Sequence, residues 1–191
     1  MTAPWRSPLS RALHRNRSAP DARYIQLATV RSNGSPANRT VVFRGFRDGT
    51  DQLQMVCDRR SAKPAQIDFA PRGEICWYFP KTREQFRLAG NLRLITSEEE
   101  DAALQAARTQ SWQAMSDSGR RLFIWPHPAQ PRQPDVPFAE EAPEATTPTD
   151  TFCLLLLLPE WVDHLELRGE PQNRWRYARD GGTWSVAEVN P

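Results

Sequence analysis

The sequence predicts a mainly β fold, an antiparallel β-barrel with a few peripheral helices. Six to eight short segments have the alternating or β-branched pattern of strands, and turn-forming residues join many of them directly. An α/β parallel sheet would need a helix after most strands, whereas the early strands here follow one another without one. The 191 residues suit a single domain, 1–191, with one hydrophobic core.

The first strands are expected to form hairpins. The segment RYIQLATV at 23–30 alternates in polarity, and SNGSP at 32–36 has the composition of a turn. The segment 38–46 is therefore expected to return as the second arm. After another turn at 47–51, residues 52–57 form a third strand.

Besides short helices near Ser7 and near Ser116, two further helices are predicted from their start signals. A short helix is expected from Ser61, because Pro64 suits a first helical turn. Ser97, followed three residues later by Glu100, has the spacing of a capping box, which predicts a helix from there to about Met115.

The second half of the chain supplies the remaining strands. Residues 84–96 form a long strand, in which Gly90 predicts a bulge or bend. The run FCLLLLL at 152–158 is expected to be a buried strand, and EWVDHLEL and RWRYAR are two further strand candidates. A proline-rich loop is expected at about 126–150, before the run at 152–158.

The composition excludes several classes of protein. Lys plus Arg is 25 and Asp plus Glu is 23, so the net charge of +2 gives no long-range attraction to nucleic acid or membranes. The longest apolar run covers seven residues, whereas a membrane span needs about 20. The N-terminal segment lacks the apolar centre of a secretory signal.

The cysteines and histidines predict a cytoplasmic protein without a metal site. The odd number and wide spacing of Cys57, Cys76 and Cys153 argue against a disulfide framework and fit a reducing compartment. No C-x-x-C motif occurs, and the three histidines are far apart in the sequence, so no zinc site is expected.

One set of residues has the chemistry of a phosphate site. The predicted helix at Ser61 begins with unpaired amides at the positive end of its dipole, and Lys63 adds a charge. Arg39 is two strands earlier, so it would reach the same phosphate if its hairpin packs beside the helix. The plainer interpretation is a helix cap with solvated basic side chains.

Gln85 and the residues around it have the chemistry of a site for a flat heterocycle. A glutamine side chain offers an acceptor and donors to a ring edge that alternates C=O and N–H groups. Trp77, Tyr78, Phe79 and Phe86 are close to it in the sequence and would wall a planar ring. The plainer interpretation assigns these aromatic side chains to the core.

The order and spacing of these segments resemble a known family. R-T-V-V-F-R-G at 39–45, S-A-K at 61–63, C-W-Y-F-P-K-T-R-E-Q-F-R-L-A-G at 76–90 and a late W…R-x-x-Y resemble the pyridoxamine 5′-phosphate oxidase superfamily. The string at 76–90 is most similar to a subgroup of FMN-dependent flavoproteins of unassigned substrate. The resemblance implies a split β-barrel homodimer with two FMN sites at the subunit interface.

The resemblance also implies which residues bind the cofactor. Ala62 replaces an arginine of the family's phosphate contacts, and Cys57 falls where a threonine would contact the flavin. Arg120 or Arg121 stands near the position at which the family has a Gln-Ser pair. The implied FMN-binding residues are Arg39, Arg44, Ser61 and Lys63 around the phosphate, Cys57 and Gln85 at the flavin, and Trp161 and Arg174, which reach the FMN from near the C-terminus.

The substrate is left open by the resemblance. Glu170, Pro171 and Gln172 stand where the vitamin B6 oxidase has Arg-Leu-His, and a glutamate at an arginine position would repel a substrate phosphate. The leading hypothesis is an oxidoreductase that transfers hydride through flavin N5 to or from an unknown small organic molecule, with no catalytic side chain assigned. The alternatives are a non-catalytic flavin carrier or sensor, a pyridoxamine/pyridoxine 5′-phosphate oxidase and, least favoured, a haem-handling split barrel.

Overall fold

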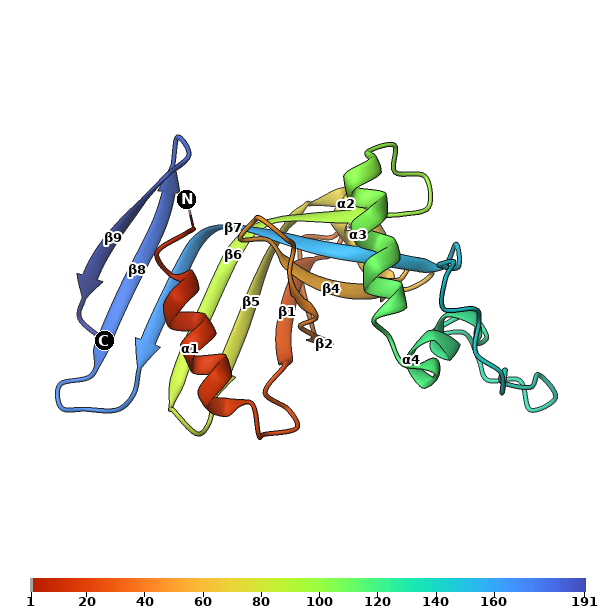
Figure 1. Cartoon of the computed structure of the whole chain (residues 1–191), viewed down its shortest axis with the longest axis horizontal. Coiled ribbons are helices and arrows are strands. Elements are labelled where there is room, and N and C mark those ends of the chain that lie inside the picture. Colours follow the sequence, from red (N-terminus) through yellow and green to blue (C-terminus); the bar gives the residue numbers. More distant parts are fainter. Residues whose placement is uncertain (1) are drawn as a thin grey trace.

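The computed structural model describes residues 2–191, and their strands form one curled antiparallel sheet. The strand order is β2-β1-β5-β6-β7-β4-β3, and β8 and β9 continue from β7 as a hairpin at one end of the molecule (Figure 1). The strands are β1 (Tyr24–Val30), β2 (Pro36–Val42), β3 (Gly45–Phe46), β4 (Leu53–Asp58), β5 (Arg72–Phe79), β6 (Glu84–Ile95), β7 (Phe152–Glu166), β8 (Asn173–Asp180) and β9 (Thr183–Val189). The helices are α1 (Arg6–Asn16), α2 (Ala62–Phe69), α3 (Ala102–Gln113), α4 (Asp117–Arg121) and the 3-10 turn η1 (Leu122–Ile124). The predicted β-barrel class is confirmed.

Strand β7 joins the two halves of the sheet. Its first residues pair with β4 and its last residues with β8, while β6 runs beside almost its whole length. The sequence predicted two separate strands here, and this was wrong because the chain continues through Pro159 at a bulge, where a strand tolerates proline. The predicted irregularity at Gly90 is confirmed: a Cβ at this position would lie 2.0 Å from the carbonyl oxygen of Leu158, so only glycine fits.

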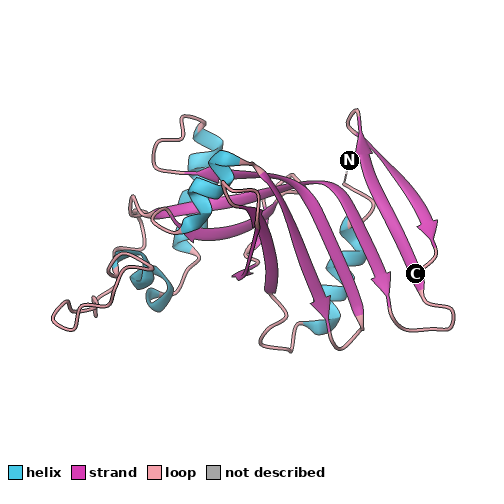
Figure 2. Cartoon of the chain, turned by 180° about the vertical axis from the view of Figure 1, so that it is seen from behind, coloured by secondary structure: helices cyan, strands magenta, loops and turns pink. Residues whose placement is uncertain are grey.

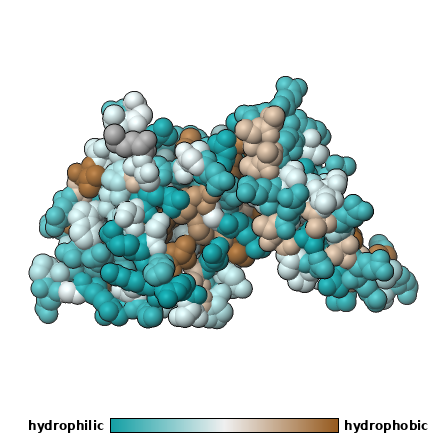
Figure 3. Space-filling model, viewed as in Figure 1, coloured by the Kyte–Doolittle hydropathy of each residue, from teal (hydrophilic) through white to brown (hydrophobic). Residues whose placement is uncertain are grey.

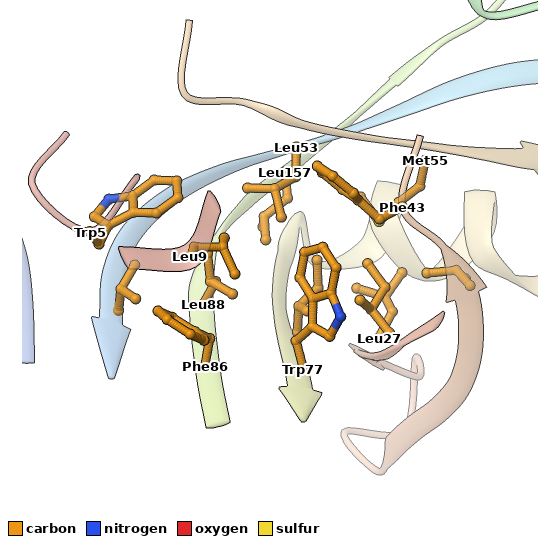
Figure 4. Close-up of a cluster of buried hydrophobic side chains, with 14 of the residues drawn as sticks. Trp5, Leu9, Leu27, Phe43, Leu53, Met55, Trp77, Phe86, Leu88 and Leu157 are labelled. Carbon is orange, nitrogen blue, oxygen red and sulfur yellow. The ribbon is translucent and has the colours of Figure 1, made fainter. Parts of the chain in front are cut away.

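The core fills the concave side of the sheet. Side chains from β1, β4, β5, β6 and β7 meet those of α1 there, including Trp5, Leu9, Leu27, Trp77 and Phe86 (Figure 4). The indole Nε1–H of Trp77 donates to the carbonyl of Ala22 at 3.0 Å, so the polar atom of this buried ring is satisfied.

Helix α2 begins next to Ser61 as predicted, but α3 does not begin at Ser97. Its N-cap is Asp101, whose carboxylate accepts hydrogen bonds from the amides of Ala103 and Leu104. Aspartate caps a helix as well as serine does, and starting there brings Leu104 onto the apolar surface formed by Ile95, Leu154 and Leu156. Tertiary packing therefore selected the later of two possible caps.

The proline-rich segment after η1 contains no helix or strand before β7 and projects from one end of the molecule (Figure 1). Its backbone is nevertheless held by side chains of the body: the buried Trp112 donates its indole N–H to Glu144 at 2.9 Å, and Arg121 donates to Glu140 at 2.7 Å.

Hydrophilic residues cover most of the face on which α1 and α3 lie, and hydrophobic residues show in the hollow between these helices (Figure 3). Among the helices of residues 2–191, none has both the length and the apolar character that a membrane span requires.

Candidate functional site

Arg39 lies against α2, as the hairpin arrangement predicted. One terminal nitrogen of its guanidinium donates to the hydroxyl of Thr29 at 2.6 Å, and the other donates to the side-chain oxygen of Gln66 on α2 at 2.7 Å. Burial and, to a smaller extent, the nearby charge of Arg31 lower the pKa of Arg39. The side chain still has N–H groups to spare for an anion, because a guanidinium carries five.

The start of α2 is open to a ligand. Ser61 is the N-cap, but its hydroxyl donates to the carbonyl of Asp58 at 2.8 Å and makes no capping hydrogen bond to the helix. The first-turn amides therefore have no side-chain partner among residues 2–191. Lys63 lies one helical turn before Gln66, on the side of α2 that meets Arg39. We call Arg39, Ser61 and Lys63 the anion cradle.

Two of the implied FMN-binding residues lie outside the anion cradle. Arg44 follows β2 and lines a separate hollow of about 380 Å³ with Gln54 and Ser111. Cys57 is 4% exposed on β4 and faces Cys153 of β7. The hydrogen bond with Cys153 and burial raise the pKa of Cys57, so this thiol remains protonated within the core.

The ring-side residues share the convex face of the sheet, opposite the core. Viewed from behind, the strands of this region lie in front of α1, and no helix covers them (Figure 2). The pairing places the side chains in three rows across β5, β6, β7 and β8: Tyr78–Gln85–Leu165–Arg174, Cys76–Arg87–Asp163–Arg176 and Glu74–Ala89–Trp161–Ala178. We call these three rows the convex-face array.

Gln85 lies at one end of the array. Its side-chain oxygen is 3.8 Å from the thiol of Cys76, which is its only hydrogen-bond contact among the described residues. Its direct neighbour, Tyr78, is 47% exposed. The amide of Gln85 is therefore available to a ligand, next to an exposed aromatic ring.

Ion pairs organise the centre of the array. Arg87 donates to Glu74 at 2.6 Å, and this hydrogen bond raises the pKa of Arg87. Arg174 donates to both carboxylate oxygens of the buried Asp163, which raises the pKa of Arg174. The guanidinium of Arg87 also lies 5.5 Å from the ring centre of Trp161. Gln85, Trp161 and Arg174 are thus on one face, separated by these charged residues.

The anion cradle and the far side of the array are distant within one chain. Arg39 is on β2 and Arg174 on β8, five strand positions apart in the order of the sheet. At about 4.8 Å per strand, this is about 24 Å measured along the curled sheet. Arg39 also shares its strand face with the buried Ala37 and Val41, whereas Arg174 lies on the convex face.

Sequence reasoning missed Asp163, Thr29 and Gln66, which hold the predicted arginines in place. The spacing of Asp163 could have identified it as a residue of the site, because it follows Trp161 by two residues and so shares its strand face. The spacing of Gln66 could have identified it as well, because it follows Lys63 by three residues on a helix and so lies on the same side. Of the two arginines near the Gln-Ser position, Arg120 is buried and bonds to Met115 and Asp117.

A buried polar cluster lies on the core side of β6 and β7. The Nε2 atom of His164 is 3.0 Å from a carboxylate oxygen of Glu84 and 3.9 Å from one of Glu166. These three residues are the one group of potential metal ligands within residues 2–191. The Nδ1 atom of His164 is buried without a partner, which disfavours Nε2 as a metal ligand, since a metal-bound imidazole normally donates its other N–H.

A cavity of about 760 Å³ lies beside the turn that leads into α2. Its lining includes Asp58, Trp125, His127 and Phe138. Arg60 fixes this wall, because it donates to the carboxylate of Asp58 at 2.6 Å and to the carbonyl of Trp125 at 2.8 Å.

The residues present fit an FMN group. Free helix amides with Arg39 and Lys63 suit a dianionic phosphate, and the available amide of Gln85 beside exposed aromatic surface suits the edge of a flavin ring. The buried Cys57 does not fit the contact that the family resemblance implied, since its side chain faces the core.

Comparisons with known proteins identify the family. Residues 2–96 match the model of the pyridoxamine 5'-phosphate oxidase, FMN-binding domain. The chain is 36% identical over 194 residues to pyridoxine/pyridoxamine 5'-phosphate oxidase 2 of Arabidopsis thaliana, covering 99% of this chain and 98% of the relative. The chain belongs to the pyridoxamine 5'-phosphate oxidase family of FMN-binding proteins.

Solved structures agree with this assignment. A pyridoxamine 5'-phosphate oxidase-related, FMN-binding protein from Nostoc punctiforme PCC 73102 is 55% identical, covers 100% of both chains and has a TM-score of 0.96. PhzG from Burkholderia lata 383, in complex with tetrahydrophenazine-1-carboxylic acid, has a TM-score of 0.79 at 17% identity and covers 100% of this chain and 94% of its own. The second similarity concerns the fold alone.

Proposed function

We propose that the protein is an FMN-dependent oxidoreductase that acts on a small organic molecule. The observation that carries this proposal is the pair of preformed sites: an anion cradle at the start of α2 and an available glutamine amide beside exposed aromatic surface. The membership in an FMN-binding family supports the same ligand. Bound FMN would supply the redox chemistry, and the protein would bind and orient it.

We further propose that the protein works as a homodimer with FMN at the interface. Within one chain, Trp161 and Arg174 lie four and five strands from Arg39 in the sheet order, and on the opposite face of the sheet. A second copy that brings Trp161 and Arg174 of its own array to the anion cradle and Gln85 of the first chain would complete the site. Arg44 and Cys57 are left out of the proposed contacts, because Arg44 lines a separate hollow and Cys57 faces Cys153.

The side chains of this protein would divide the work of binding. Arg39 and Lys63 would neutralise the phosphate together with the amides of α2. Gln85 would fix the edge of the ring by hydrogen bonding, and Trp161 and Arg174 from the second copy would close its other side. The cavity beside Asp58 gives room for an organic substrate next to this site. The three free cysteines fit a reducing, cytoplasmic setting.

The first test is flavin binding. Purified protein is titrated with FMN, and flavin fluorescence and visible absorbance are followed. We expect saturable binding with one FMN per chain, and riboflavin, which lacks the phosphate, should bind more weakly. Protein that leaves the spectrum unchanged and releases no heat on mixing would refute the proposal.

The second test separates an enzyme from a carrier. The FMN-loaded protein is mixed with NADPH under nitrogen and then exposed to air. Bleaching of the flavin followed by recovery of its colour supports turnover. A spectrum that does not respond to NADPH or to other candidate reductants favours a carrier or sensor.

A second candidate function is the oxidation of pyridoxine or pyridoxamine 5′-phosphate. The full-length similarity to the Arabidopsis relative favours it. The exposed Glu170 at a position where the resemblance implies an arginine argues against it, since a carboxylate would repel the substrate phosphate. Formation of pyridoxal 5′-phosphate from either substrate by the FMN-loaded protein decides between the two candidates.

A further inference from the structure

Asp163 is a buried carboxylate on which arginines of neighbouring strands converge. It lies on β7, directly between Arg87 of β6 and Arg176 of β8 in the register of the sheet. Its side chain is 2% exposed although it lies on the convex face, because the basic side chains cover it. A buried charge of this kind requires close partners.

Arg174 is its strongest partner. The Nε atom of Arg174 is 3.0 and 3.2 Å from the two carboxylate oxygens of Asp163, and one terminal nitrogen is 2.8 Å from the second oxygen. This is the forked geometry in which a carboxylate fixes the plane of a guanidinium. Arg176 approaches only to 3.6 Å and its side chain is 50% exposed.

The fork leaves part of Arg174 unused. The other terminal nitrogen makes no hydrogen bond with residues 2–191, and its N–H groups point away from the carboxylate because the guanidinium is planar. A long arginine side chain would otherwise lose considerable rotamer entropy on binding a ligand, so an aspartate that holds it in advance improves affinity.

We infer that Asp163 is a positioning residue for the cofactor: it orients Arg174 so that the free edge of the guanidinium meets the bound FMN. The inference rests on the proposed function, in which Arg174 contacts FMN. It adds a residue that acts through Arg174 and need not touch the cofactor itself.

A double-mutant cycle tests this coupling. FMN dissociation constants are measured for the full-length wild type, D163N, R174Q and the double variant, with the visible circular dichroism of the bound flavin as a second readout. We expect each single change to weaken binding by about tenfold or more, the scale of a charged hydrogen bond. The double variant should bind no more weakly than R174Q, because Asp163 acts only through Arg174.

The control is E99Q, which removes the carboxylate partner of Arg93 outside the convex-face array. It should leave FMN affinity and the flavin spectrum unchanged. Additive losses in the cycle, or unchanged affinity in D163N, would overturn the inference while leaving flavin binding by the wild type intact. If the wild type binds no FMN, the proposed function fails and the inference fails with it.

If D163N does not fold, R174K provides the test with Asp163 in place. A lysine ammonium cannot form the fork. Loss of FMN affinity with an unchanged melting temperature of the apoprotein supports the inference, and wild-type affinity overturns it.

Discussion

At the scale of single residues, the site depends on side chains that hold other side chains. Arg39 is fixed by Thr29 and Gln66, and Arg174 by Asp163. In each pair the arginine was visible as a candidate from the sequence, whereas its partner comes from a different strand or helix. The partners decide where the charge of the arginine is presented.

The change Arg39→Ala should reduce FMN affinity by about 1.5–3 kcal/mol, because a hydrogen bond between charged groups is lost. Isothermal titration of the apoprotein with FMN measures the loss. The matched control is Arg11→Ala, an exposed arginine on α1. Equal affinity for the Arg39 variant and the wild type would show that the phosphate is not bound at the anion cradle.

Glu84 makes the stability of the protein depend on pH. Burial alone would raise the pKa of Glu84, but hydrogen bonds from His164 and Thr82, and the nearby charges of His164 and Arg15, lower it below the usual value of a glutamate. A carboxyl group with a lowered pKa in the folded state stabilises the protein fully above its unfolded pKa. That contribution is lost as the pH falls through the folded pKa.

We therefore expect the melting temperature of Glu84→Gln to lie below that of the wild type at pH 6, and the difference to shrink as the pH falls below about 4. Thermal unfolding of both proteins across this range measures it. A difference that stays constant with pH would mean that the ionisation of Glu84 is not coupled to folding.

At the scale of elements, local signals located most strands and helices but not all of their ends. The strand pattern of β1 and the glycine of β6 were sufficient to predict a strand and a bulge. Local signals were not sufficient to predict the start of α3, because Ser97 and Asp101 are both good caps. Only the fit of Leu104 to β7 distinguishes them. The continuity of β7 through Pro159 likewise depends on its pairing with β6.

The two caps give a direct test. Asp101→Ala should lower the free energy of unfolding by about 1 kcal/mol, because two helix amides lose their acceptor. Ser97→Ala, at the cap that the sequence predicted, should change it by less than about 0.5 kcal/mol, as for other exposed positions. Urea unfolding of both variants measures these values, and the opposite ranking would show that α3 begins at Ser97 in solution.

At the scale of the whole molecule, the two halves of the candidate site lie on different parts of one curled sheet. The concave side is filled by the core, so a ligand has only the edge near α2 and the convex face available. The proposed dimer resolves this separation by combining the anion cradle of one chain with the far side of the array of the other.

If the site spans two chains, FMN release should follow dissociation of the dimer. Sedimentation velocity at decreasing protein concentration, recorded at the visible absorbance of the flavin, should show bound FMN only in the dimer. Trp161→Ala, on the convex face, should reduce FMN retention in dimers that remain intact. Monomers that keep FMN as tightly as dimers would contradict the interface site.

The sequence by itself determined the antiparallel β class, the helix at Ser61 and the residue types suited to FMN, because these depend on short-range periodicity, caps and the chemistry of single side chains. The tertiary structure decided which candidates come together. It placed Arg39 at α2, buried Cys57 against Cys153 and set Arg174 on Asp163, since strand register brings together residues far apart in the chain. No local pattern contains that register, and it follows from the packing of the whole sheet.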